Sequence, residues 1–169
     1  MLLLTTGRMQ NKLYVLIELL WWAITAIVVI VVQYPIWNAG IDWVFQVSNT
    51  MFIVTLITLA RHIFTLHYSL IGQLQIVKAV IMVAMIPFTF FLISDLNAFQ
   101  TYIGEQLWDK LTGHLPYASR RPMESYMWNE MLFFAAGSII AAPALSVRLF
   151  ISIWRQYNAE KHKVYQTRG

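Results

Sequence analysis

Four charged residues of this sequence stand within or beside long apolar stretches, where a charge is energetically expensive. Glu18 lies inside the first stretch, and the basic residues border the others: Arg61, Lys78 and Arg148. An ionised side chain at membrane depth normally faces a partner or a water-filled cavity. Together the four would form an inner polar layer that acts as a proton or ion relay, or that holds an anionic lipid headgroup. We favour the alternative, a structural ion pair that fixes helix packing, aided by long basic side chains reaching toward the interface, because Glu18 lies close enough to the interface to be partly hydrated.

Other reactive side chains give weaker indications. The chain has no cysteine, which excludes disulfides, thiolate metal sites and cysteine nucleophiles. His62 and His67 could ligate a metal or haem, but their spacing of five places them about 140° apart around a helix. No zinc spacing, HExxH sequence, phosphate-binding loop or nucleophile motif is present. The sequence therefore predicts no catalytic residue, no metal site and no cofactor.

The composition decides where these residues must be placed. Of the 169 residues, 59% are apolar and only 12% are charged, and the mean hydropathy is +0.58. Soluble domains carry roughly 25% charged residues, so about half of the usual solubilising charge is missing. A core as small as this chain can form would not hide so much apolar surface from water. The sequence predicts an all-α integral membrane protein with a single transmembrane domain.

Four segments are long enough to cross a hydrocarbon layer of about 30 Å, which takes about 20 apolar residues. They cover about 13–33, 44–61, 76–93 and 130–153, and we expect the first to be an uncleaved signal-anchor. Between the last two, apolar residues recur at helical spacing, and they predict an amphipathic helix over about 95–112 that lies in the membrane interface. A short basic tail, 155–169, follows the last span.

Basic residues are distributed unevenly in this four-span layout. Nine of the twelve fall in 1–12, in 61–78 and from Arg148 on, whereas the other side holds three basic and six acidic residues. Because lysine and arginine stay in the cytoplasm, both termini are predicted to be cytoplasmic, in the bacterial inner membrane. The net charge of +4 then reflects topology and lipid headgroups, so no nucleic-acid partner is expected. Tryptophans are predicted to anchor the interfaces: Trp37, Trp43, Trp108, Trp128 and Trp154.

Small residues on the last span indicate a packing face. The pairs Gly137 with Ala141 and Ser138 with Ala142 are four residues apart, which lets another helix backbone approach closely. The face could pack within this chain or against another subunit.

Three functions remain open. The favoured one is a non-catalytic accessory subunit of a larger inner-membrane complex of the secretion, conjugation, respiratory or motor type. Its partners would be the bilayer and other membrane-protein subunits, and an anionic lipid is a further candidate. The alternative is a small, homo-oligomeric transporter or channel that uses Glu18 and the inner basic residues. A membrane enzyme or haem-bearing electron carrier is disfavoured, because the sequence offers no converging ligands.

Overall fold

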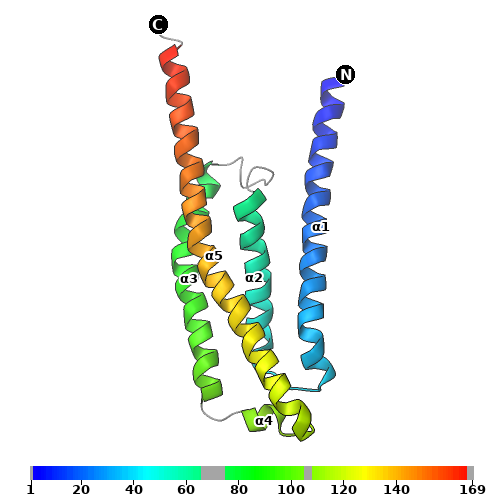
Figure 1. The fold of residues 1–169 in the computed structure, drawn as a ribbon. Coiled ribbons are helices and arrows are strands. Elements are labelled where there is room, and N and C mark those ends of the chain that lie inside the picture. Colours follow the sequence, from blue (N-terminus) through cyan, green and yellow to red (C-terminus); the bar gives the residue numbers. More distant parts are fainter. Residues whose placement is uncertain (1, 66–74, 105–107, 167–169) are drawn as a thin grey trace.

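The computed structural model describes residues 2–65, 75–104 and 108–166, and the side chains of residues 15–158 within those ranges. The described part contains helices and no strand: α1 Leu2–Asn38, α2 Gln46–Thr65, α3 Gln75–Gly104, α4 Trp108–Thr112 and α5 Tyr117–Gln166. Four of them, α1, α2, α3 and α5, are long and apolar enough to cross a membrane. The predicted all-α architecture is therefore confirmed. Leu2 and Gln166 lie at the same end of the molecule, and α4 lies at the opposite end (Figure 1).

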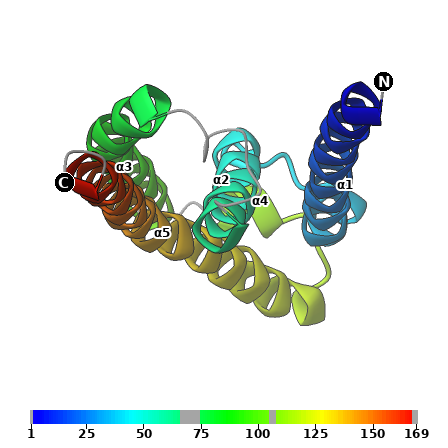
Figure 2. The same ribbon diagram turned by 90° about the horizontal axis from the view of Figure 1, so that it is seen from above.

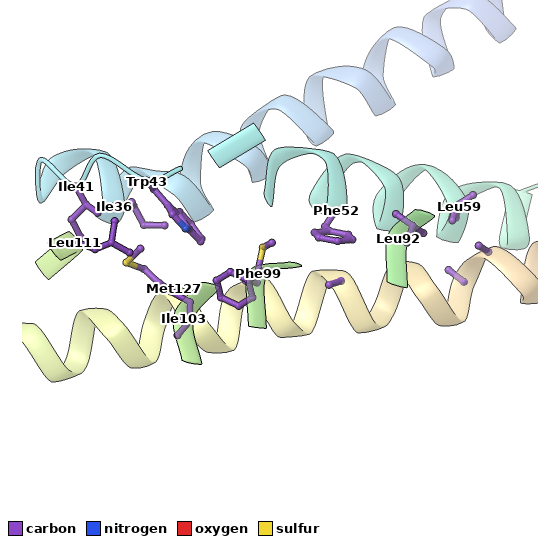
Figure 3. Close-up of a cluster of buried hydrophobic side chains, with 14 of the residues drawn as sticks. Ile36, Ile41, Trp43, Phe52, Leu59, Leu92, Phe99, Ile103, Leu111 and Met127 are labelled. Carbon is purple, nitrogen blue, oxygen red and sulfur yellow. The ribbon is translucent and has the colours of Figure 1, made fainter. Parts of the chain in front are cut away.

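α5 is the helix against which α2 and α3 are assembled. Both lie along it, while α1 stands to one side (Figures 1 and 2). Buried apolar side chains follow these contacts along the molecule, among them Phe52, Leu92 and Phe99 (Figure 3). Since lipid chains are as apolar as these residues, such helices are held by close van der Waals contact and hydrogen bonds rather than by exclusion of water.

A glycine ends α1 and directs the chain into α2. Gly40 has a φ of 65°, the left-handed conformation that side chains disfavour. Its N–H donates to the Trp37 carbonyl at 3.0 Å, and the Ile41 N–H is directed at the Ile36 carbonyl at 3.4 Å. These are the two bonds of a Schellman motif, and the apolar contact expected with it is present because Ile36 and Ile41 are both buried.

The region from 95 to 112 differs from the separate interfacial helix that the sequence predicts. Residues 95–104 continue α3 without interruption, and only Trp108–Thr112 form the short helix α4. The apolar repeat is real, but it faces the protein: Phe99 and Ile103 are buried in the core. The Phe99 ring lies 5.5 Å from both the Phe45 and the Trp128 ring. An apolar stripe fits lipid and protein equally well, which is why periodicity misplaced this segment.

The other helices also extend beyond the predicted spans. α5 has 50 residues and is therefore about 75 Å long at 1.5 Å per residue. It begins at Tyr117, well before the predicted start near 130. Hydropathy marks only the apolar part of such a helix, whereas its backbone hydrogen bonds continue into polar sequence.

α1 has little contact with the other helices. Its apolar stretch is 6% buried, against 33% for that of α5. The buried side chains of its described part are Thr25, Gln33 and Ile36, on one face and toward its C-terminal end. Toward its N-terminus α1 diverges from α2 (Figure 3). Bulky side chains are exposed on its other faces, among them Leu16, Leu20, Ile27, Ile30 and Val31.

The turn after α1 gives a first prediction. Gly40→Ala should destabilise the protein by about 1–2 kcal/mol, the cost of a left-handed conformation for a residue with a Cβ. Gly104→Ala is the matched control, because Gly104 lacks a positive φ and an added Cβ would meet nothing within 4 Å. Unfolding midpoints in mild detergent measure both variants, and equal effects would contradict the role given to Gly40.

Candidate functional site

One ion pair lies in the predicted inner polar layer. Arg61 Nη2 on α2 contacts Glu18 Oε1 on α1, with side-chain exposures of 8% for Arg61 and 34% for Glu18. The guanidinium carbon also lies 5.7 Å from the centre of the Trp21 ring, within the range of a cation–π interaction. The pair thus joins α1 to α2 at a level where most neighbouring side chains of α1 are exposed.

The other two residues of the predicted layer lie elsewhere. Lys78 on α3 is 2% exposed, and its Nζ donates to Ser152 Oγ of α5 at 3.1 Å. Arg148 on α5 is exposed. All four residues lie toward the end of the bundle that holds the termini, but they occupy three settings: an α1–α2 ion pair, an α3–α5 hydrogen bond and an exposed cation. They do not converge on one point.

The small residues of α5 face α2. Ser138 and Ala142 are fully buried, Ala141 is 7% exposed, and Ser138 Oγ donates to the Phe52 carbonyl at 2.9 Å. A Cβ added at Gly137 would lie 2.8 Å from a methyl carbon of Leu56. Within the described chain, this face is therefore occupied by an intramolecular contact.

The predicted tryptophan anchors fall into different environments. Trp37 and Trp154 are exposed, and Trp108 and Trp128 are half-buried against the core. Trp43 differs from the prediction, because it is 4% exposed and lies inside the core cluster (Figure 3). It follows the turn after α1, where the Schellman motif directs the chain inward.

The described histidines belong to no cluster of metal-ligating side chains. His62 Nδ1 donates to the Thr58 carbonyl at 2.7 Å within its own helix. The ring borders a cavity of about 230 Å³ between α2, α3 and α5, whose lining is otherwise mostly apolar. No group of three or more His, Cys, Asp or Glu side chains that could hold a metal occurs in the part of the chain that the structure describes. His67 lies outside the described residues.

A second polar cluster lies toward the α4 end of the bundle, and the sequence did not predict its acids or the convergence of its side chains. We call it the amide–acid layer; its side chains come from all four long helices and are buried or half-buried. Its members are Gln33 on α1, Ser48, Asn49 and Thr50 on α2, Asp95 on α3, and Tyr126 and Glu130 on α5. Along α2, Asn49 and Arg61 are separated by about 18 Å, at 1.5 Å per residue.

The centre of the amide–acid layer is a contact between α2 and α5. Asn49 Nδ2 donates to Glu130 Oε1 at 2.6 Å; Asn49 is fully buried and Glu130 is 8% exposed. The remaining oxygens of these side chains, Asn49 Oδ1 and Glu130 Oε2, are buried without a partner among the described residues. Buried polar atoms are nearly always hydrogen-bonded, so such orphaned atoms require an explanation.

Further hydrogen bonds extend the layer to α1 and α3. Gln33 Nε2 donates to Thr50 Oγ1 at 2.5 Å, and the Tyr126 hydroxyl donates to the Val32 carbonyl at 2.7 Å. Ser48 Oγ donates to Asp95 Oδ1 at 3.2 Å. The first turns of α2 therefore hold side chains from each of the other three long helices.

Sequence reasoning missed this layer because it assigned its acids to polar loops. Asp95 was expected near the start of the interfacial helix, and Glu130 at the edge of the last span. One signal was available: spacings of seven and eleven residues place Glu130 on the same face of α5 as Gly137 and Ala141. A carboxylate on a small-residue packing face is a candidate for burial.

Comparison of the chain with protein-family models, with curated proteins and with solved structures found no match.

The ion pair between Glu18 and Arg61 gives a second prediction. Glu18→Gln should destabilise the protein more than Arg61→Met, because it leaves the more deeply buried charge without a counter-ion. The double variant should recover part of the loss, with a coupling energy of about 0.5–3 kcal/mol. The free energies of unfolding of the wild type, both single variants and the double variant, measured in mild detergent, give this coupling energy. Arg148→Met is the control and should have little effect, and a coupling energy of zero would contradict the pairing.

Proposed function

We propose that the chain is a non-catalytic accessory subunit of a larger complex in the bacterial inner membrane, of the secretion, conjugation, respiratory or motor type. The observation that carries this proposal is the position of α1, whose apolar stretch is 6% buried. Membrane helices associate through van der Waals packing and interhelical hydrogen bonds. Within its own chain, α1 has little van der Waals packing. A helix of another subunit would provide the missing contacts.

The side chains available for such a partner lie on one face of α1. Leu20 and Ile27 are each 59% exposed, and a spacing of seven residues places them on the same face. The residues that bond to α2, Glu18 and Gln33, lie on another. A partner helix could therefore pack against α1 without disturbing its hydrogen bonds and ion pair with α2.

A homo-oligomeric transporter or channel that uses Glu18 and the inner basic residues has less support. Glu18 is already paired with Arg61, and Lys78 is bound to Ser152. The region between the ion pair and the amide–acid layer contains fully buried apolar side chains such as Phe52 and Leu92. A hydrated pathway through this bundle would have to displace them.

Orientation is part of the proposal. The start of α1 and the end of α5 lie at one end of the bundle (Figure 1), and nine of the twelve basic residues belong to the segments assigned to that side. We place this end in the cytoplasm by the distribution of lysine and arginine. The basic segment 155–169 would then meet anionic lipid headgroups, while α4 and the start of α5 face the periplasm.

Cysteine labelling tests the orientation, because the chain contains no cysteine of its own. Tyr117 and Tyr157 are 88% and 64% exposed and lie toward opposite ends of α5. In spheroplasts, Tyr117→Cys should react with a membrane-impermeant maleimide, whereas Tyr157→Cys should react only after the membrane is permeabilised. The reverse pattern would show that the orientation is inverted.

Site-specific photocrosslinking tests the subunit proposal. A photoreactive residue at position 20 or 27 should give one discrete protein adduct, and the adduct partner should copurify in fixed ratio in mild detergent. Val83 on α3, which is 61% exposed, is the matched control and should give less adduct. Coexpression of two differently tagged copies distinguishes a contact with another subunit from a contact between two copies of this chain. Adducts only between these copies, or a chain that purifies alone as a stable monomer, would exclude the accessory-subunit proposal.

A further inference from the structure

The contact between Asn49 and Glu130 leaves two complementary atoms unpartnered. One hydrogen bond, from Asn49 Nδ2 to Glu130 Oε1, is present at 2.6 Å. The orphaned atoms, Asn49 Oδ1 and Glu130 Oε2, belong to the same two groups. Both are acceptors when the carboxyl is ionised, so they cannot bond to each other in that state.

We propose that Glu130 is a proton-binding site, with the proton held on Oε2 and donated to Asn49 Oδ1. A carboxylic acid and a primary amide can form two hydrogen bonds in a closed ring, each group giving one donor and one acceptor. The amide half of this ring is already formed. A single proton supplies the other half and satisfies both orphaned atoms. The ligand of the site is thus a proton exchanged with water.

The surroundings of Glu130 supply no positive charge among the described residues. The hydrogen-bond partner of Glu130 is the amide of Asn49 on α2. The residues on either side of Asn49 bond to the uncharged Gln33 of α1 and to Asp95 of α3, a further acid. On α5 the Tyr126 hydroxyl donates to the Val32 carbonyl, so it does not serve the carboxylate. Arg61, the buried cation of α2, is about 18 Å away along the helix. An ionised Glu130 would therefore be a buried and uncompensated charge, which is strongly unfavourable.

Binding of the proton would act on the packing of α2 against α5. The Asn49–Glu130 contact lies on the helix pair that Ser138 also joins, through its hydrogen bond to the Phe52 carbonyl. With the proton, two hydrogen bonds hold the helices together at this level. Without the proton, the hydrogen bond between Glu130 Oε2 and Asn49 Oδ1 is lost, and the buried carboxylate becomes more stable in water than in the bundle. The α2–α5 contact therefore weakens as the pH rises.

Infrared spectroscopy of the full chain in lipid vesicles tests the protonation state directly. At neutral pH the wild type should show the C=O stretch of a protonated carboxyl, which Glu130→Gln abolishes and the control Asp95→Asn retains. Asn49→Leu should shift this band, because it removes the amide partner. If Glu130→Gln instead removes a carboxylate (COO⁻) band from the wild-type spectrum, Glu130 is ionised and the proposal is wrong. A protonated band that appears only when sodium is replaced by choline would also overturn the proposal, because it would indicate a cation site.

Unfolding measurements give an independent readout. Glutamine reproduces both hydrogen bonds of the protonated acid, so Glu130→Gln should fold and should match the wild type in acid, where the carboxyl holds its proton in both the folded and the unfolded chain. The unfolded chain releases that proton above about pH 4, so the wild type should lose stability as the pH rises from there until the folded chain releases it too. Glu130→Gln should lack this decline and should be more stable than the wild type at neutral pH. Glu130→Ala should be less stable than Glu130→Gln at every pH. Glu124→Gln is the matched control: Glu124 accepts a hydrogen bond from Thr112 at 2.6 Å, and its variant should keep the decline. A Glu130→Gln chain that fails to fold, or a wild type stabilised by sodium, would overturn the proposal.

Discussion

The close approach of α5 to α2 determines most of what this molecule can do. It depends on small side chains: Ser138 and Ala142 are fully buried, and a Cβ added at Gly137 would lie 2.8 Å from Leu56. The same approach allows Ser138 to reach the Phe52 carbonyl and Glu130 to reach Asn49. A larger side chain at the fully buried positions Ser138 or Ala142 would overpack this contact.

The bundle contains polar side chains at two levels, and the acids at each level have different kinds of partner. Near the termini, Arg61 compensates Glu18 by direct charge pairing. In the amide–acid layer, the described acids have only amide and hydroxyl partners. Lipid offers no water to buried polar groups, so each must be satisfied within the protein. An ion pair does this by direct charge compensation, whereas an acid–amide pair satisfies all of its polar atoms only while the acid holds its proton.

Much of the architecture follows from composition, and much of the site does not. The missing charge and the four apolar stretches predict four long helices, and the depth of Glu18 makes Arg61 a candidate partner. The segment from 95 was misplaced because the repeat of Phe99 and Ile103 fits lipid as well as protein. The pairing of Asn49 with Glu130 was missed because hydropathy places both at the edges of spans. Their burial depends on how far α5 extends and how it crosses α2, which are properties of the assembled bundle.

The attachment of α1 and the proposed proton site meet at the start of α2. Asn49 and Thr50 are consecutive residues: one holds Glu130 of α5, and the other accepts the hydrogen bond from Gln33 of α1. A movement of this turn when Glu130 loses its proton would therefore be transmitted to α1. Near the middle of α1, Glu18 is held by the ion pair with Arg61, which does not depend on that proton. The exposed face that we propose meets another subunit lies between these two attachments. The proposed proton site and the proposed partner surface are thus joined through adjacent residues of one turn of α2.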